Sequence, residues 1–250
     1  MRKIIILILI GLLSALIMIG CDGGGVVPPG NGGNGDIPSS AESTVLVEAY
    51  IAVKCPFCSQ IEPIIENLAT EYGKDKMILV ELAPWGANYS ISEAYQRYKW
   101  YGLTDGVPQV TFNGLNNNFH GVKSYSEIKN RIEAQLSQSP IIELGASRTT
   151  SSSITTISGK VKNISGATLT NLVVNGMSFV NRGITGFRYS VTDIFEEHKV
   201  IISSLASGEE KEFTMTIPNL NWDIQGLDGV IFVQSLADGK KTIMQSLFLD

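Results

Sequence analysis

Hydrophobic residues follow two different patterns along this chain. Between residues 44 and 138, short runs rich in β-branched and aromatic residues alternate with stretches in which hydrophobic residues recur every three or four positions. From residue 140 onward only short runs remain, and some of them alternate strictly between hydrophobic and polar residues. The first pattern predicts strands alternating with helices, and the second predicts strands alone.

The first pattern predicts elements in the order β-α-β-α-β-β-α. Strands are expected at residues 44–51, 77–82, 109–112 and 119–122, and helices at residues 61–72, 91–101 and 125–136. Ser124 and Glu127 have the spacing of a capping box at the start of the last helix. A strand–helix–strand unit followed by a hairpin and a helix predicts a mixed sheet with helices on both faces.

The second pattern predicts an antiparallel sandwich. Strands are expected at residues 141–146, 153–161, 168–174, 186–191, 200–205, 212–217, 229–236 and 242–249. Turns are expected at 163–166, 175–176, 207–208 and 238–239, where glycine and asparagine gather. The turns at 163–166 and 207–209 resemble those of bacterial Ig-like or fibronectin-like extracellular domains. We therefore expect an all-β, Ig-like sandwich over residues 140–250, with a binding, spacing or docking role.

The N-terminus has the features of an export signal. Arg2 and Lys3 precede an apolar run of about 16 residues, which is shorter than the roughly 20 residues of a membrane-spanning helix. The sequence Met18-Ile19-Gly20-Cys21 resembles the lipobox of bacterial lipoproteins, in which the cysteine is lipidated. We therefore expect a signal peptide at residues 1–20 and lipidation at Cys21, the alternative being an uncleaved anchor helix. Either would attach the chain to a membrane.

A flexible tether is expected at residues 21–43. Seven glycines and three prolines occur among the nineteen residues 22–40, a composition that buries too little surface to fold. The rest of the 250 residues can form cores, because 44% of the chain is hydrophobic and 17% is charged. Without Arg2 and Lys3, 17 basic residues face 24 acidic ones, a charge of −7, so no nucleic-acid partner is expected. With only two histidines, no His-rich metal site is expected.

The chemistry is expected at Cys55-Pro56-Phe57-Cys58, between the first strand and the first helix. Two thiols three positions apart at a helix start can form a disulfide, and the partial positive charge of the helix N-terminus stabilises a thiolate at Cys55. This predicts thiol–disulfide exchange through the cysteine pair, without a cofactor or a metal. The alternatives are half of a zinc site, a copper site and an inert structural disulfide.

Three features together resemble the thioredoxin superfamily. They are the motif Cys55-Pro56-Phe57-Cys58, which is closest to that of glutaredoxins, Pro63 in the first helix, and Gly106-Val107-Pro108 before a strand. The resemblance covers residues 44–138 and implies an α/β thioredoxin-like domain at 44–139. It also implies that the Val107-Pro108 bond is cis and lies against the two sulfurs, with the Val107 backbone pairing with a bound substrate chain.

The chain departs from this family at two positions. Lys54 stands where thioredoxins carry tryptophan before the first cysteine. The family's buried carboxylate, which moves protons for the resolving cysteine, has only Glu48 as a counterpart on the first strand. The alternative for Glu48 is a strand residue that faces solvent. The segment 83–90 is longer than a minimal connection and is expected at the rim of the site.

The sequence thus predicts an exported, lipid-anchored thiol–disulfide oxidoreductase of the cell envelope, facing the periplasm or the exterior. Cys55 is the expected attacking thiol, Cys58 the resolving thiol, and Val107 and Pro108 the substrate platform. The expected partners are cysteine-containing envelope proteins, a membrane redox donor or acceptor, and the lipid bilayer. The alternative is an envelope adaptor whose sandwich binds a partner while the first domain is a scaffold. Metal handling by the two thiolates is a third possibility.

Overall fold

The computed structural model describes residues 39–86, 88–183, 185–237 and 239–250. These residues belong to one compact unit, Ile37–Asp250. The expected signal peptide, Cys21 and the tether up to residue 38 lie outside the described residues. Within the described residues, no helix is long and apolar enough to cross a membrane.

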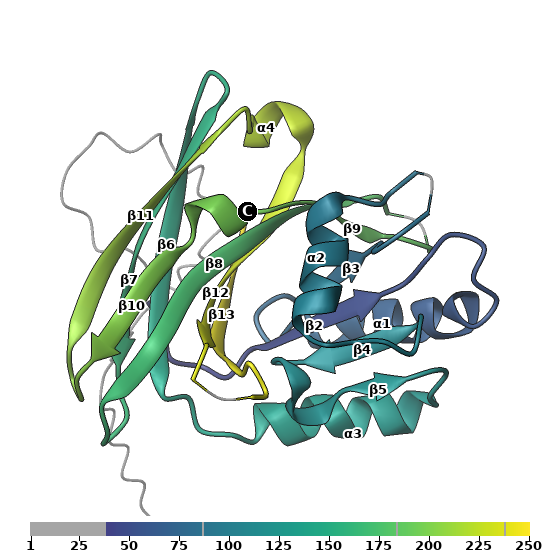
Figure 1. Cartoon of the computed structure of the whole chain (residues 1–250), viewed down its shortest axis with the longest axis horizontal. Coiled ribbons are helices and arrows are strands. Elements are labelled where there is room, and N and C mark those ends of the chain that lie inside the picture. Colours follow the sequence, from purple (N-terminus) through teal and green to yellow (C-terminus); the bar gives the residue numbers. More distant parts are fainter. Residues whose placement is uncertain (1–38, 87, 184, 238) are drawn as a thin grey trace, which may run out of the picture. The chain divides into compact units, whose positions relative to one another are not determined.

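Strands outnumber helices in the described residues (Figure 1). The strands are β1 (Ser39–Ser40), β2 (Val45–Tyr50), β3 (Met77–Leu82), β4 (Gln109–Phe112), β5 (Phe119–His120), β6 (Ile142–Ser151), β7 (Ile154–Asn163), β8 (Leu169–Asn181), β9 (Tyr189–Ile194), β10 (Val200–Leu205), β11 (Glu210–Pro218), β12 (Leu227–Ser235) and β13 (Ile243–Leu249). The helices are α1 (Cys58–Tyr72), α2 (Ser92–Trp100), α3 (Tyr125–Leu136) and the short α4 (Trp222–Gln225), with 3-10 turns η1 (Leu115–Asn117) and η2 (Glu196–His198).

Two sheets organise the described residues, and both halves of the chain contribute to the larger one. The smaller sheet has four strands in the order β1-β6-β7-β11. The larger has nine, in the order β13-β12-β8-β9-β3-β2-β4-β5, with β10 also paired to β8. The two halves join where β9 runs parallel to β3, at the pair Glu81 and Ser190.

The predicted fold class, an α/β thioredoxin-like domain followed by an all-β Ig-like sandwich, is therefore wrong. The chain is mostly β, and one sheet runs through both predicted domains instead of ending between them. The expected element order of residues 44–138 is nevertheless present from β2 to α3. The physical reason for the difference is that the hydrophobic pattern predicts single strands and does not specify their neighbours.

The turn predicted at Gly176 is part of a strand in the structure. Residues 175 and 176 were expected to form a turn, yet they lie inside the thirteen-residue strand β8. A Cβ atom at Gly176 would lie 2.5 Å from the Ile231 side chain and 2.8 Å from the Val230 carbonyl oxygen. The glycine is needed here for close packing against β12. Similarly, Ser39 and Ser40 of the expected tether form β1 and pair with β6.

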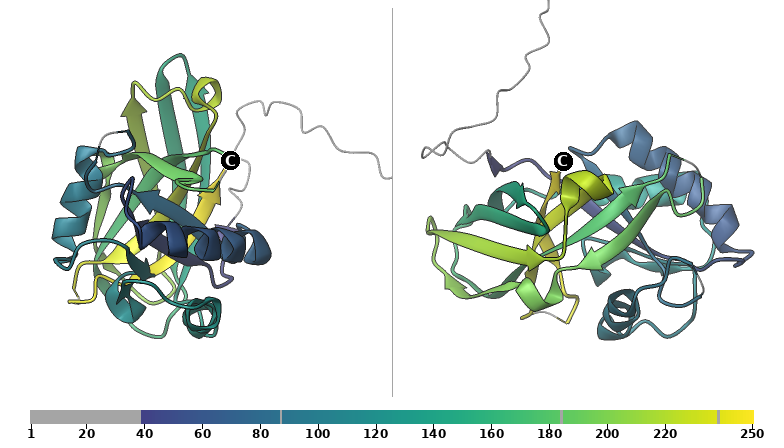
Figure 2. Two further views of the ribbon diagram at one scale, coloured as in Figure 1. Left: turned by 90° about the vertical axis from the view of Figure 1, so that its right-hand side faces the viewer. Right: turned by 90° about the horizontal axis from the view of Figure 1, so that it is seen from above.

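Three hydrophobic cores hold these elements together. The first lies between the smaller sheet and β8, β10, β12 and β13, and contains Leu144, Ile157, Val174 and Ile231. The second lies between α1, α3 and one face of β2, β3 and β4. The third covers the other face of β2 and β3 and joins α2 to β8 and β12. Figure 2 shows α1 and α2 on different sides of these strands.

Candidate functional site

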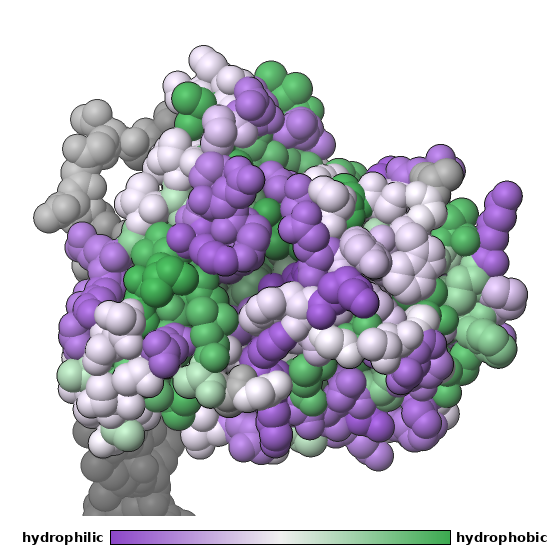
Figure 3. Space-filling view, viewed as in Figure 1, coloured by the Kyte–Doolittle hydropathy of each residue, from purple (hydrophilic) through white to green (hydrophobic). Residues whose placement is uncertain are grey.

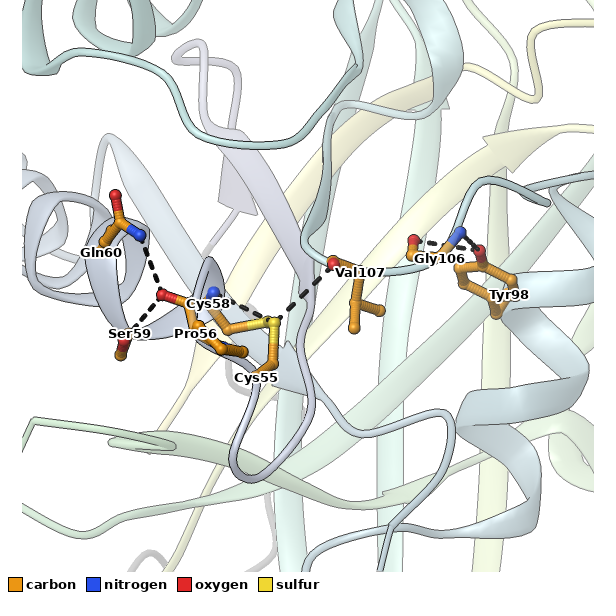
Figure 4. Close-up of a disulfide and its surroundings, with 8 residues drawn as sticks. All are labelled: Cys55, Pro56, Cys58, Ser59, Gln60, Tyr98, Gly106 and Val107. Carbon is orange, nitrogen blue, oxygen red and sulfur yellow. Dashed lines mark hydrogen bonds between the residues drawn. A yellow bond between two sulfur atoms is a disulfide. The ribbon is translucent and has the colours of Figure 1, made fainter.

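Cys55 and Cys58 form a disulfide at the N-terminus of α1 (Figure 4). The Cα atoms lie 5.2 Å apart. Cys55 is half-buried in the loop after β2, whereas Cys58 is the first residue of α1 and only 1% exposed. Phe57 between them is 60% exposed. Of the two cysteines, Cys55 is therefore the one more exposed to an approaching thiolate, and it lines a pocket.

Hydrogen bonds at the start of α1 hold the loop that carries Cys55 in place. The Pro56 carbonyl oxygen accepts hydrogen bonds of 3.0 Å from the side chains of both Ser59 and Gln60. The Cys58 backbone N–H points at the Cys55 sulfur, with an N–S distance of 3.1 Å. An N–H directed at a sulfur favours its negatively charged form, so the backbone is arranged to stabilise a Cys55 thiolate once the disulfide is reduced.

The segment before β4 lies against the disulfide. The Val107–Pro108 peptide bond is cis, and the Val107 carbonyl oxygen lies 3.7 Å from the Cys55 sulfur. Tyr98 of α2 holds the preceding residue, because its hydroxyl donates to the Gly106 carbonyl oxygen and accepts from the Gly106 N–H, both at 3.1 Å. Cys55 and the Val107–Pro108 segment are thus brought together, and their role in substrate binding stays a prediction.

Glu48 lies elsewhere. Its carboxylate is 0% exposed and is paired with Arg97, with an Nε–Oε1 distance of 2.5 Å. It also accepts hydrogen bonds from the hydroxyls of Tyr101, at 2.6 Å, and Tyr50, at 3.3 Å. Tyr50 belongs to the third core, whereas Cys58 belongs to the second, so Glu48 and Cys58 lie on opposite faces of the sheet. The solvent-facing alternative for Glu48 is wrong, and among the described residues nothing links its carboxylate to the cysteine pair.

Three other glutamates lie on the disulfide's face of the sheet. Glu62 and Glu66 follow Cys58 at successive four-residue steps along α1, and all three side chains are buried. Glu81 of β3 is 1% exposed on the same face, since its neighbours in the alternation, Leu79 and Ala83, belong to the second core. No sequence pattern described above predicted this group. The four-residue spacing from Cys58 was the available signal.

Burial disfavours charge on two of these carboxyls. Burial and, to a lesser degree, the neighbouring Glu66 raise the pKa of Glu62 to about 7. Burial also raises the pKa of Glu81 to about 8, although the Tyr189 N–H donates to its carboxylate at 2.7 Å and opposes the shift. A second contact comes from the same part of the chain as Tyr189. The N–H of Gly186, which precedes β9, donates a hydrogen bond to the Glu66 carboxylate at 2.9 Å.

A pocket of about 340 Å³ opens beside the disulfide. Its lining includes Lys54, Cys55, Glu62, Tyr89, Gly186 and Phe187. The rings of Tyr89 and Phe187 lie 5.0 Å apart and form an aromatic wall. Tyr89, from the segment 83–90 that was expected at the rim, does line the pocket. Phe187 comes from the connection between β8 and β9, which no feature of the sequence related to the cysteines.

The described residues contain no group of three or more histidine, cysteine, aspartate or glutamate side chains arranged to hold a metal ion. The three glutamates do not form such a group, and the disulfide occupies both cysteine sulfurs. The site therefore contains a disulfide between half-buried Cys55 and buried Cys58. The Val107 carbonyl oxygen lies next to Cys55, and the adjacent pocket contains the acid Glu62.

The fold is similar to that of HBP35 of Porphyromonas gingivalis. The match has a TM-score of 0.66 at 15% sequence identity and covers 84% of this chain and 75% of that one. At this identity the likeness concerns the fold. Two partial matches are a domain of the outer membrane lipoprotein Omp28 from Porphyromonas gingivalis (TM-score 0.33, 11% identity, 44% of this chain, 86% of that one) and dsbF of MTB (TM-score 0.29, 18% identity, 38% and 82%). No protein-family model and no curated protein sequence matches the chain.

Proposed function

We propose that this protein is a thiol–disulfide oxidoreductase that exchanges disulfides with cysteine-containing proteins of the cell envelope. One observation carries the proposal: half-buried Cys55 lines an open pocket, while its disulfide partner Cys58 is buried at the start of a helix. An attacking thiolate meets Cys55, and Cys58 is the leaving group. The helix-start position and the Cys58 N–H directed at the Cys55 sulfur also support an exchange role, because both favour a Cys55 thiolate.

The exchange conserves atoms and electrons. A substrate thiolate attacks the Cys55 sulfur, the bond between Cys55 and Cys58 breaks, and Cys58 leaves as a thiolate that takes up a proton. A second substrate thiolate then attacks the substrate sulfur in the mixed disulfide and releases the Cys55 thiolate. The substrate loses two electrons and the cysteine pair gains them. The reverse sequence reduces a substrate disulfide, and a membrane redox donor or acceptor restores the starting state.

Val107 and Pro108 are the proposed platform for the substrate chain. The contact of 3.7 Å between the Val107 carbonyl oxygen and the Cys55 sulfur supports this assignment, because an extended chain bound there would hold its own sulfur next to Cys55. The N-terminal sequence supports an envelope location. A charged end, an apolar run and Cys21 in a lipobox-like setting fit export and lipid anchoring on the periplasmic or exterior side.

Trapping tests the proposed function. A Cys58→Ser variant keeps an accessible thiolate at Cys55 without the group that resolves a mixed disulfide, so it should accumulate mixed disulfides with envelope proteins. Cys55→Ser is the matched control, since it also leaves one cysteine of the pair, but a buried one. Non-reducing gels followed by mass spectrometry would identify the trapped proteins. Equal trapping by both variants, or none by either, would refute the proposal.

A second candidate function is that of an envelope adaptor that binds a partner through its second half. A cleft of about 270 Å³ between α2 and the strands β8, β9 and β12 favours it. Figure 3 shows a hollow with a hydrophobic floor and hydrophilic rims in this region, and Trp100 and Ile194 are among the lining residues. Partner capture that survives in the Cys55→Ser, Cys58→Ser double variant would favour the adaptor over the enzyme.

A further inference from the structure

Glu62 is a buried acid that lines the pocket beside the disulfide. Its side chain belongs to α1, one turn after Cys58, and the residue is 8% exposed. Among the described residues it forms no hydrogen bond and no ion pair, and its nearest charged neighbour on α1 is another acid, Glu66. Its carboxylate borders the open pocket without a cation or a donor among the described residues, so a cationic group that entered the pocket would gain an ion pair that the free protein lacks.

The rest of the pocket suits the hydrocarbon part of a long side chain. Tyr89 and Phe187 form one wall, and Val53, which is 37% exposed, adds apolar surface near the mouth. The hydrogen bond from the Gly186 N–H to Glu66 fixes the Phe187 wall to α1. At about 340 Å³ the pocket lies at the small end of ligand sites, a size that fits one side chain of a polypeptide.

We propose that this pocket binds a lysine or arginine side chain of the substrate polypeptide, close in sequence to the substrate's reactive cysteine. The alkyl chain would pack against Tyr89 and Phe187, and the cationic head would pair with Glu62. Because Cys55 lines the same pocket, a side chain bound there belongs to the segment that carries the attacked sulfur. The inference rests on the proposed function, since it names the substrate class of the same site.

Lys54 is the neighbouring group that opposes this assignment. It also lines the pocket, so its ammonium repels a second cation. However, Lys54 is exposed, and among the described residues it forms no ion pair with Glu62. Its charge is therefore screened by water more strongly than that of Glu62.

Matched peptides test the specificity. Each carries one disulfide and differs only at one position beside a cysteine, which is lysine, norleucine or glutamate. The wild-type protein should exchange the lysine peptide with a kcat/KM about tenfold above that of the norleucine peptide, as expected for one charge-assisted hydrogen bond, and the glutamate peptide should be slowest. In Glu62→Gln the ratio of lysine to norleucine should fall to about two or less. Glu71→Gln, at an exposed position of the same helix, should keep the wild-type ratio.

The pH dependence of the ratio gives an independent readout. Burial holds the pKa of Glu62 near 7, so the preference for lysine should be larger at pH 8 than at pH 6. The titratable groups around Glu62 are Glu66 on its own helix, Glu81 on β3, Lys54 and Tyr89 at the pocket, and Cys55 in the same pocket once the disulfide is reduced. Ionisation of the Cys55 thiol cancels in the ratio because every peptide reacts with the same protein. The effect of the neighbouring charge on the peptide's own thiols is present equally in Glu62→Gln, so the comparison with that variant isolates the contribution of Glu62.

Three outcomes would overturn the inference: no preference for lysine, a preference for the glutamate peptide, or a lysine preference that persists in Glu62→Gln. Failure of the proposed function looks different, because no peptide would then turn over. In that case calorimetry with the same peptides carrying serine for cysteine still measures the pocket. A lysine peptide that binds wild type more tightly than Glu62→Gln supports the pocket assignment, and equal binding refutes it.

Discussion

Replacing Glu81 with glutamine should stabilise the protein at neutral and alkaline pH. Glu81 is buried on β3 among other acids, and burial raises its pKa from 4.5 to about 8. Its carboxyl therefore stays protonated in the folded chain at pH values where the unfolded chain ionises it. A glutamine keeps the shape, can accept the hydrogen bond from the Tyr189 N–H, and has no charge to lose.

The sign and size follow from proton linkage. A carboxyl whose pKa is raised on folding contributes stability that is complete below pH 4.5 and is lost as the pH rises through 8. Between these limits the free energy of unfolding falls by about 1.4 kcal/mol per pH unit, which amounts to a loss of about 5 kcal/mol for Glu81 over the whole window. The glutamine variant escapes this loss, so its advantage over wild type should grow from pH 5 and level off near pH 8.

Urea unfolding of the oxidised protein, followed by tryptophan fluorescence at several pH values between 5 and 9, measures this difference. Glu71→Gln is the matched control. Hydrogen bonds from Lys129 and Tyr125 lower the pKa of Glu71, so its contribution is already complete at pH 5 and its difference from wild type should stay flat. A stability difference for Glu81→Gln that does not change with pH would refute the reasoning.

Three further variants test other parts of the structure. Arg97→Met leaves the buried Glu48 without its cation and should lower the free energy of unfolding by about 3–5 kcal/mol in urea titrations, and a loss below 1 kcal/mol would contradict the buried pair. Gly159→Ala places a Cβ atom 2.2 Å from a backbone carbonyl oxygen and should cost about 1–3 kcal/mol or more, whereas Gly166→Ala, with nothing within 4 Å, should cost less than 1 kcal/mol in the same titration. Tyr98→Phe removes the hydroxyl that holds the segment before β4 at the disulfide, so kcat/KM for disulfide exchange should fall several-fold while the free energy of unfolding drops by about 1 kcal/mol. Unchanged kinetics would show that this hydroxyl has no positioning role.

Local features of the fold could be predicted because they depend on neighbouring residues. Helical spacing of hydrophobic residues predicted α1 and α2, and Ser124 and Glu127 form the expected capping box of α3. The cysteine motif predicted a disulfide at a helix start, and the structure has it. Each of these depends on a few consecutive positions, where sequence and geometry are directly related.

Features that depend on distant partners could not be predicted. Alternation in β9 shows that one face is buried, but it does not show that β3 is the neighbour. Glu48 was expected in solvent or near the cysteines, yet it is neutralised by Arg97, which lies 49 residues further along the chain. Glu62 on a helix has the pattern of a solvated residue, and the sequence does not show that Phe187, 125 residues further along the chain, lines the same pocket.

The third core contains Leu46 and Tyr50 of β2 as well as Phe179 of β8 and Phe232 of β12. The strands beneath the cysteine pair therefore share one interior with the C-terminal half. Cutting the chain near residue 139 would expose these aromatic side chains to water and leave β3 as an open sheet edge, a combination that favours aggregation. An attempt to graft the redox centre onto another carrier would have to move both halves together.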